Sequence, residues 1–227
     1  MSHTAPAHPL RVIAIDGPAG AGKSSVSAQL AARLGFTRLD TGALYRAIGL
    51  AALRAGARAE EGEGLRALLA GLRVALDGAE VLLNGVAEGD ALRRPEVSAA
   101  ASDFARLPSV RARLLDLQRE IGAAQPCVVD GRDIGTVVFP DAPLKIYLTA
   151  SARARAERRL LELEAKGMSQ PLDEVQREIE ARDAQDASRP IAPLRRAEDA
   201  VLVDATALGL EEVVARCYAL AVGVFGG

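Results

Sequence analysis

A glycine-rich segment near the start of the chain has the residue types and spacing needed to hold phosphate groups. Residues 17–24 read Gly-Pro-Ala-Gly-Ala-Gly-Lys-Ser and match the pattern G-x-x-x-x-G-K-[ST]. Glycines let backbone N–H groups turn toward phosphate oxygens, and the N-terminus of a following helix adds positive potential. We therefore expect a nucleoside triphosphate here, with Lys23 bridging its β- and γ-phosphates and the Ser24 hydroxyl, together with waters, coordinating Mg²⁺. The residues predicted to contact the phosphates are Gly17, Pro18, Ala19, Gly20, Ala21, Gly22, Lys23, Ser24 and Ser25.

The elements that must position this loop are indicated on both sides of it. Residues 11–16 form a short β-branched run that predicts a buried strand, and the apolar spacing of residues 23–34 predicts a helix that Gly35 ends. Strand, glycine loop and helix in this order are the setting in which the motif binds phosphates, and they open an α/β fold. A dinucleotide-binding fingerprint is excluded because Ser25 stands where its third glycine should be.

Hydrophobic patterns along the rest of the chain extend the α/β prediction. The expected strands are Cys127–Asp130, Leu144–Leu148 and Ala200–Asp204, and the expected helices cover about 43–55, 110–121, 151–166, 172–182 and 210–221. Residues 72–87 differ, because Asp-Gly and Asn-Gly pairs between short apolar runs predict antiparallel hairpins. We expect a disordered tail at 1–10 and then one domain over residues 11–227. Its parallel-sheet core would comprise about 11–55, 106–150 and 183–227, with excursions at about 56–105 and 151–182.

The composition is that of an ordinary globular protein and excludes several classes. The 227 residues are 49% hydrophobic and 26% charged, so the chain is not globally disordered. A formal charge of −2 gives no argument for binding a nucleic acid polymer or a membrane surface, and no apolar run reaches the roughly 18 residues of a membrane span. The distant cysteines, Cys127 and Cys217, do not form a disulfide framework. We expect a cytoplasmic monomer that acts on small molecules.

Classes of phosphate-loop protein differ in what else they require. A GTPase needs an Asn-Lys-x-Asp guanine reader, but the only asparagine, Asn84, is followed by Gly85. A motor or transporter ATPase needs long coupling elements, for which this chain leaves little room. A small-molecule kinase remains, since it needs one insertion to hold an acceptor and one arginine-bearing flap to close over the phosphates.

Three further segments together resemble the bacterial cytidylate kinases, which are P-loop nucleoside monophosphate (NMP) kinases. Residues 39–46 read Leu-Asp-Thr-Gly-Ala-Leu-Tyr-Arg, and residues 129–140 read Val-Asp-Gly-Arg-Asp-Ile-Gly-Thr-Val-Val-Phe-Pro. Residues 180–194 begin Glu-Ala-Arg-Asp and end Arg-Pro-Ile-Ala-Pro-Leu. The resemblance runs from about Arg11 to Ala221. It implies a P-loop kinase core with a parallel sheet flanked by helices, an NMP-binding insertion that contains a small antiparallel sheet, and a helical lid.

The same resemblance implies transfer of the γ-phosphoryl group of ATP to CMP or dCMP with Mg²⁺, and it assigns residues to this reaction. The acceptor phosphate would be held by Thr41, Tyr45, Arg46 and Arg132. The cytosine would be read by Ser102, Arg111 and Asp133, and the ribose would be contacted by Arg182 and Asp186, with Arg189 reaching toward the phosphates. The lid, residues 151–182, would close over the triphosphate with Arg155, Arg158 or Arg159. The residues expected to act on the reacting groups are Lys23, Arg132, Arg155 and Arg158.

The residue types at these positions suit the chemistry on general grounds. Arginine forks offset the repulsion between a dianionic acceptor and an anionic donor. Cytosine presents an amino donor beside two acceptors, to which Asp133 and Arg111 are complementary. Asp130, at the end of its expected strand, could hold a Mg²⁺-bound water or orient Arg132, and both roles stay open. A kinase for AMP, UMP or a non-nucleotide acceptor, and a nucleotide-binding module without turnover, are the alternatives.

Overall fold

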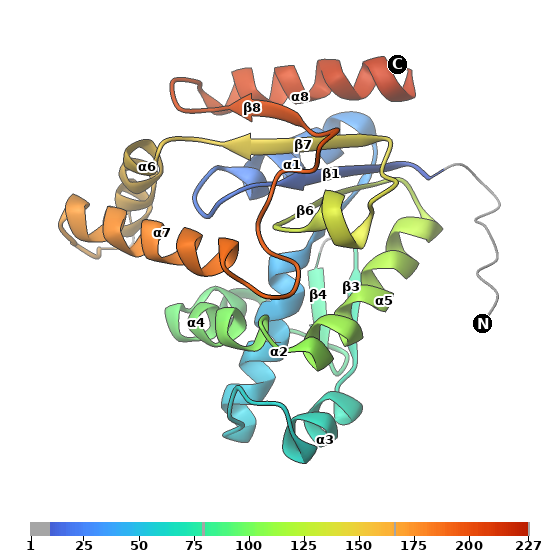
Figure 1. Ribbon diagram of the computed structural model, residues 1–227, viewed down its shortest axis with the longest axis vertical. Helices are drawn as coiled ribbons and strands as arrows, with labels where there is room; N and C mark the ends of the chain where they lie inside the picture. The colour runs from blue at the N-terminus through green and yellow to red at the C-terminus, as the bar shows by residue number, and fades with distance from the viewer. Residues whose placement is uncertain (1–9, 79, 166, 227) are drawn as a thin grey trace. The chain divides into compact units, whose positions relative to one another are not determined.

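The computed structural model describes residues 10–78, 80–165 and 167–226, and the chain divides into two compact units (Figure 1). The first unit comprises Met1–Phe36 and Pro126–Gly227, and the second comprises Thr37–Gln125. The expected disordered tail at 1–10 lies outside the described residues, apart from Leu10. The expected excursion at about 56–105 falls within the second unit, and the one at about 151–182 falls within the first.

The first unit is built on parallel strands. β1 (Val12–Asp16) pairs in parallel with β6 (Cys127–Gly131) and β7 (Leu144–Thr149), and β7 pairs in parallel with β8 (Val201–Asp204). Within the first unit these strands have the order β6-β1-β7-β8. Every residue of β1 is buried, as a strand with neighbours on both sides requires. The sheet and its helices confirm the predicted α/β class.

Four helices and one π-helical turn complete the described part of the first unit. They are α1 (Lys23–Leu34), the turn Ile134–Val138, α6 (Ala152–Glu164), α7 (Leu172–Ala187) and α8 (Leu210–Phe225). Helix α1 has the predicted bounds, but α7 continues beyond the predicted end at residue 182. Ion pairs of Asp183 and Asp186 hold its last turn, and apolar periodicity does not detect such contacts. Of the helices in the described ranges, none is long and apolar enough to cross a membrane.

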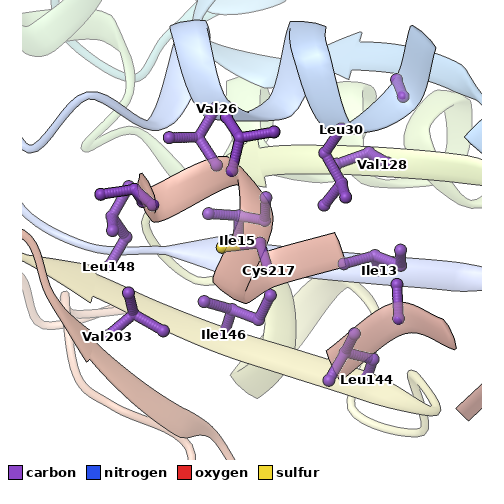
Figure 2. Close-up of a cluster of buried hydrophobic side chains, with 14 of the residues drawn as sticks. Ile13, Ile15, Val26, Leu30, Val128, Leu144, Ile146, Leu148, Val203 and Cys217 are labelled. Atoms are coloured by element: carbon purple, nitrogen blue, oxygen red, sulfur yellow. The ribbon is translucent and has the colours of Figure 1, made fainter. Parts of the chain in front are cut away.

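Figure 2 shows the apolar cluster that joins the sheet to helices α1 and α8. Ile13 and Ile15 of β1 lie in it with Val26 and Leu30 of α1, and none of these side chains is more than 1% exposed. Cys217 of α8 belongs to the same cluster, and burial raises the pKa of its thiol to about 11, so it acts as a packing residue. The cluster fixes α1 against β1 and thereby fixes both ends of the loop that connects them.

The second unit consists of short helices and a small sheet. Its elements are β2 (Thr37–Asp40), α2 (Thr41–Ala55), α3 (Glu63–Gly71), β3 (Val74–Asp77), β4 (Glu80–Leu83), β5 (Val86–Ala87), a 3-10 turn (Gly89–Arg93), α4 (Pro95–Phe104) and α5 (Pro108–Ala124). β3, β4 and β5 form an antiparallel sheet, which confirms the small sheet predicted at 72–87. Between β4 and β5, Asn84 and Gly85 both have positive φ, the backbone that an Asn-Gly hairpin turn needs.

Helix α2 packs closely on α4 within the second unit. Ile48 of α2 and Val97 of α4 are each 1% exposed. A Cβ on Gly49 would lie 2.8 Å from the backbone nitrogen of Ala101, so the close approach of the two helices depends on a residue without a side chain. Neither α3 nor α4 was predicted: each is only nine or ten residues long, although Leu65 and Leu69 of α3 and Val97 and Phe104 of α4 are buried at helical spacing.

Candidate active site

The loop from the end of β1 to the start of α1 depends on its glycines. A Cβ on Gly17 (φ 148°) would lie 1.9 Å from the carbonyl oxygen of Leu148 in β7, so no larger residue fits. Gly22 (φ 91°) is the N-cap of α1 and has the left-handed backbone that favours glycine. The first N–H groups of α1 have no partners within the helix, so the loop ends on backbone donors that suit an anion.

Lys23 is the first residue of α1, and its ammonium group lies against the loop. Its Nζ donates to the carbonyl oxygens of Gly17 at 2.7 Å and Pro18 at 2.6 Å, and the residue is 6% exposed. Burial lowers the pKa of Lys23 well below its usual value, and the positive charge of Arg132 lowers it further, whereas nearby carboxylates oppose both effects. The side chain that is predicted to act on the phosphates is therefore held in place by the loop itself.

A carboxylate and two hydroxyl groups meet beside Lys23. Asp130 is the residue before Gly131, the last residue of strand β6, and it is 4% exposed. The Ser24 hydroxyl donates to Asp130 Oδ2 at 3.4 Å, and the Ser27 hydroxyl donates to Asp130 Oδ1 at 2.5 Å. Oxygen atoms of the kind that coordinate hard cations therefore lie together at the start of α1, next to the exposed Ser25.

Asp186, near the end of α7, joins two of the arginines predicted to contact the nucleotide. Arg132 Nε donates to Asp186 Oδ2 at 2.8 Å, and Arg189 forms an ion pair with Asp186 Oδ1. Asp186 is 2% exposed, so both pairs are shielded from water. The fold therefore brings Arg132, which is distant in sequence, to the neighbouring pair Asp186 and Arg189, whereas Arg182 is exposed on α7.

Asp133 directly precedes the π-helical turn Ile134–Val138 and is 5% exposed. A second carboxylate, that of Asp16 at the end of β1, interacts with it. Burial and the negative charge of Asp133 raise the pKa of Asp16 from 3.8 to about 6, although two backbone hydrogen bonds lower it. Asp16 was not among the predicted site residues. Its position at the carboxyl end of a parallel strand, where α/β proteins bind their ligands, was the available signal.

Arg155 of α6 is bonded to the phosphate-binding loop. Its Nη1 donates to the carbonyl oxygen of Ala19 at 2.9 Å, and its Nε donates to that of Ala150 at 2.9 Å. It also forms an ion pair with Asp183 of α7 at 2.6 Å and is 5% exposed. Asp183 was not predicted either, since only the fold shows that it lies beside an arginine on another helix.

The other two arginines of the expected lid have different surroundings. Arg158 donates to the carbonyl oxygen of Ala205, beyond the end of β8. Arg159 pairs with Glu162 at 3.0 Å on the exposed face of α6. Within the first unit, Arg155 is thus the arginine of this group that contacts the loop.

The second unit holds the remaining predicted site residues. They are Thr41, Tyr45 and Arg46 on α2, Ser102 on α4 and Arg111 on α5. The Asp40 carboxylate accepts from the backbone N–H of Ala43 and from Arg46 Nη2, both at 3.0 Å. The Arg111 guanidinium lies 5.8 Å from the centre of the Tyr45 ring, within cation–π distance. Two residues from different helices, one predicted to hold phosphate and one to read the base, are therefore neighbours.

Comparison with known proteins places these features in a family. The sequence pattern of the cytidylate kinases matches residues 13–222. This chain belongs to the cytidylate kinase family. It is 50% identical over 209 residues to the cytidylate kinase of Syntrophotalea carbinolica, covering 90% of this chain and 89% of that one. It is also 50% identical over 208 residues to the cytidylate kinase of Carboxydothermus hydrogenoformans, covering 90% of this chain and 94% of that one.

Membership in the cytidylate kinase family confirms the resemblance that the sequence segments indicated, and it makes the chain a nucleotide kinase. Among solved structures, an uncharacterized protein from Eubacterium ventriosum is similar with a TM-score of 0.54 over 95% of this chain and 99% of that one. At 12% identity, this similarity supports the fold alone.

Proposed function

We propose that this chain transfers the γ-phosphoryl group of ATP to CMP or dCMP, giving ADP and CDP or dCDP, in pyrimidine nucleotide metabolism. The observation that carries this proposal is the cytidylate kinase pattern over residues 13–222, which includes the complete phosphate-binding loop. An oxygen of the acceptor phosphate forms a bond to the γ-phosphorus, and the bond from that phosphorus to the β–γ bridging oxygen breaks. The acceptor phosphate is already ionised, so positioning and electrostatics suffice without a general base.

On the donor side, Lys23 and the loop backbone bind the triphosphate. The ammonium group would exchange its two carbonyl partners in the loop for β- and γ-phosphate oxygens, which are stronger acceptors because they are charged. Burial of Lys23 excludes water from the cation, so its attraction for the developing charge is weakly screened.

The oxygen donors at the start of α1 fit Mg²⁺. This ion prefers oxygen ligands, binds through few protein groups and keeps several waters. The Ser24 hydroxyl would hold it directly, and Asp130 would hold one of its waters. When bound, Mg²⁺ neutralises charge on the phosphates. Of the two roles open for Asp130, this one is supported by its hydrogen bond from the Ser24 hydroxyl.

Arg155 is the lid arginine for which contacts support a role at the phosphates. Its Nη1 already donates to Ala19 in the loop, and the same nitrogen forms the ion pair with Asp183. A phosphate oxygen can take the place of the Ala19 carbonyl while Asp183 keeps the planar group oriented. Arg158 would support the lid through its bond to Ala205, outside the loop.

On the acceptor side, the family resemblance assigns the phosphate of CMP to Arg132, Thr41, Tyr45 and Arg46. Arg46 has the capacity for this, because its Nε is buried with no hydrogen-bond partner among the described residues. The base would be read by Asp133 with Arg111 and Ser102. The ribose would be contacted by Arg182 and Asp186, and Arg189, which forms an ion pair with Asp186, would reach toward the phosphates.

One coupled assay tests the function. ADP release is measured with ATP and Mg²⁺, first without an acceptor and then with CMP, dCMP, UMP or AMP. We expect release to depend on the acceptor and to be fastest with CMP or dCMP. Equal release without an acceptor would indicate a simple ATPase, no release would indicate a binding module, and a preference for AMP or UMP would assign the chain to a different nucleotide.

A further inference from the structure

Asp16 is a fully positioned, buried carboxylate to which the mechanism above assigns no task. It ends β1, is 4% exposed, and uses each of its oxygens for a separate bond. Oδ1 accepts from the backbone N–H of Ile134 at 2.8 Å, and Oδ2 accepts from that of Gly135 at 2.7 Å. Burying a carboxylate is costly unless hydrogen bonds compensate for lost water, so this pair of bonds is what allows Asp16 to occupy the site.

The two N–H groups belong to the start of the π-helical turn, where a helix has donors without partners of its own. In the same turn, the backbone carbonyl of Asp133 accepts from Val137 at 2.9 Å and from Val138 at 3.2 Å. The side chain of Asp16 therefore accepts the first N–H groups of the turn, while the backbone carbonyl of Asp133 accepts the later ones. The segment whose orientation is set in this way carries Arg132 and Asp133.

Gly135 leaves room beside the turn for the side chain of Lys145. A Cβ at this position would lie 3.0 Å from Cδ of Lys145 and 3.4 Å from Asp16 Oδ2. Lys145 is itself held by an ion pair with Asp199 at 2.7 Å, so it has little freedom to move aside. A side chain at position 135 would therefore press against Lys145 of β7 and disturb the turn that Asp16 holds.

We infer that Asp16 is a positioning residue for acceptor recognition, because it fixes the Arg132–Asp133 segment through the N–H groups of Ile134 and Gly135. The inference rests on the proposed function, in which Arg132 binds the acceptor phosphate and Asp133 reads the base. Asp16 acts through these residues and touches no substrate. Its loss should therefore weaken discrimination between bases, which an ordinary packing residue does not affect.

The first test is Asp16→Asn, which keeps the shape but replaces one acceptor oxygen by an NH2 group that faces a backbone N–H. We expect KM for CMP to rise about tenfold and the CMP/UMP ratio of kcat/KM to fall about fivefold, while KM for ATP stays within about twofold. The matched control is Asp204→Asn. Asp204 ends β8 and also accepts from a backbone N–H, that of Thr206, but it is exposed. We expect it to leave all these constants within about twofold of the wild type.

A second variant keeps the test decisive if Asp16→Asn does not fold. Gly135→Ala should shift the same ratio in the same direction, and amide exchange at Ile134 and Gly135 should become faster in either variant. An unchanged CMP/UMP ratio of kcat/KM in a folded variant would overturn the inference, whether both values stay the same or fall by the same factor. A wild-type chain that does not phosphorylate CMP would instead overturn the proposed function, so the two failures are distinguishable.

Discussion

The two units hold their charged side chains in different ways. In the first unit, Lys23, Asp16 and Asp186 are each less than 9% exposed and bonded to backbone or to fixed partners. In the second unit, Asp40 is shared by Arg38 and Arg46, and its side chain is 19% exposed while that of Arg46 is 27% exposed. In the first unit, these charged groups lost their contact with water when the chain folded, and fixed partners compensate for it. In the second unit, Asp40 and Arg46 stay near water and can exchange one partner for another.

This difference corresponds to two tasks of a phosphoryl-transfer site. Groups that act on the transition state are most effective when they are fixed in a low-dielectric environment before the reaction. Groups that admit and release a nucleotide benefit from partners that a phosphate can displace at little cost. We therefore expect changes at the residues that contact the ATP phosphates in the first unit to affect kcat most, and changes at the acceptor-binding residues of the second unit to affect KM.

The largest effect is expected for Lys23→Ala in the first unit. Removal of one preorganised electrostatic contact should lower kcat by about 10²- to 10³-fold with little change in thermal stability. Lys145→Met is the matched control, because Lys145 is also buried and paired, with Asp199, outside the loop. It should leave kcat within about threefold of the wild type. A normally folded Lys23→Ala enzyme with nearly unchanged kcat would contradict the role of the loop.

The burial of Asp16 predicts a distinctive dependence of stability on pH. Its pKa is about 6 in the folded chain and 3.8 as the reference value, so the folded state binds this proton more tightly than the unfolded state. The contribution of Asp16 to the free energy of unfolding is therefore fully present below about pH 4. It falls by on the order of 3 kcal/mol as pH rises through about 6. Urea unfolding from pH 4 to 7 measures this when wild type is compared with Asp16→Asn. Parallel stability curves would show that Asp16 does not titrate in this way.

The lid arginines provide a comparison within the first unit. Arg155→Ala removes the contacts to Ala19 and Asp183 and should lower kcat by up to about a hundredfold, because misplaced phosphates react slowly. Arg159→Ala removes only an exposed pair with Glu162 and should change kcat by less than about twofold. Steady-state kinetics at saturating ATP and CMP distinguishes these outcomes, and similar losses in both variants would remove the special role of Arg155.

The sequence predicted the parts of the fold that local patterns determine. Helix α1 has its predicted bounds because the loop motif starts it and Gly35 ends it. The small antiparallel sheet was predicted from its Asp-Gly and Asn-Gly turns. Strand β2 was missed because Thr-Arg-Leu-Asp has one apolar residue in four, which is too few to show the pattern of a strand.

Residues of the candidate site could be predicted only where they belong to a sequence motif. Lys23 and Ser24 follow from the loop pattern, and Arg132 and Asp133 follow from the family resemblance. Asp16 and its partner Ile134 are more than a hundred residues apart in the sequence, so no local pattern reveals their hydrogen bond. The same holds for Arg155 with Ala19. Partners of this kind depend on the tertiary fold.

The second unit should respond through KM. Arg46→Lys keeps the charge but loses the planar fork, including the buried Nε that has no hydrogen-bond partner in the described part of the chain. We expect KM for CMP to rise ten- to thirtyfold, with KM for ATP within about twofold. Arg106→Lys is the control, since Arg106 pairs with Asp103 on the exposed surface of the same unit. If the KM values for ATP and CMP rise together, Arg46 is a structural residue and the contrast between the units fails.

The smallest effect is expected for base recognition by Asp133. Its carboxylate would accept from the 4-amino group of cytosine, whereas UMP would bring a carbonyl oxygen there and leave two acceptors without a proton between them. Asp133→Asn offers an amide that can donate or accept, so the CMP/UMP ratio of kcat/KM should fall by about tenfold. Asp141→Asn, an exposed change in the chain segment after the same turn, should leave the ratio unchanged. Asp133 also lies beside Arg132, so both substrates can lose activity, and the ratio is the quantity that isolates the base. Equal losses for CMP and UMP would mean that Asp133 supports the arginine and does not read the base.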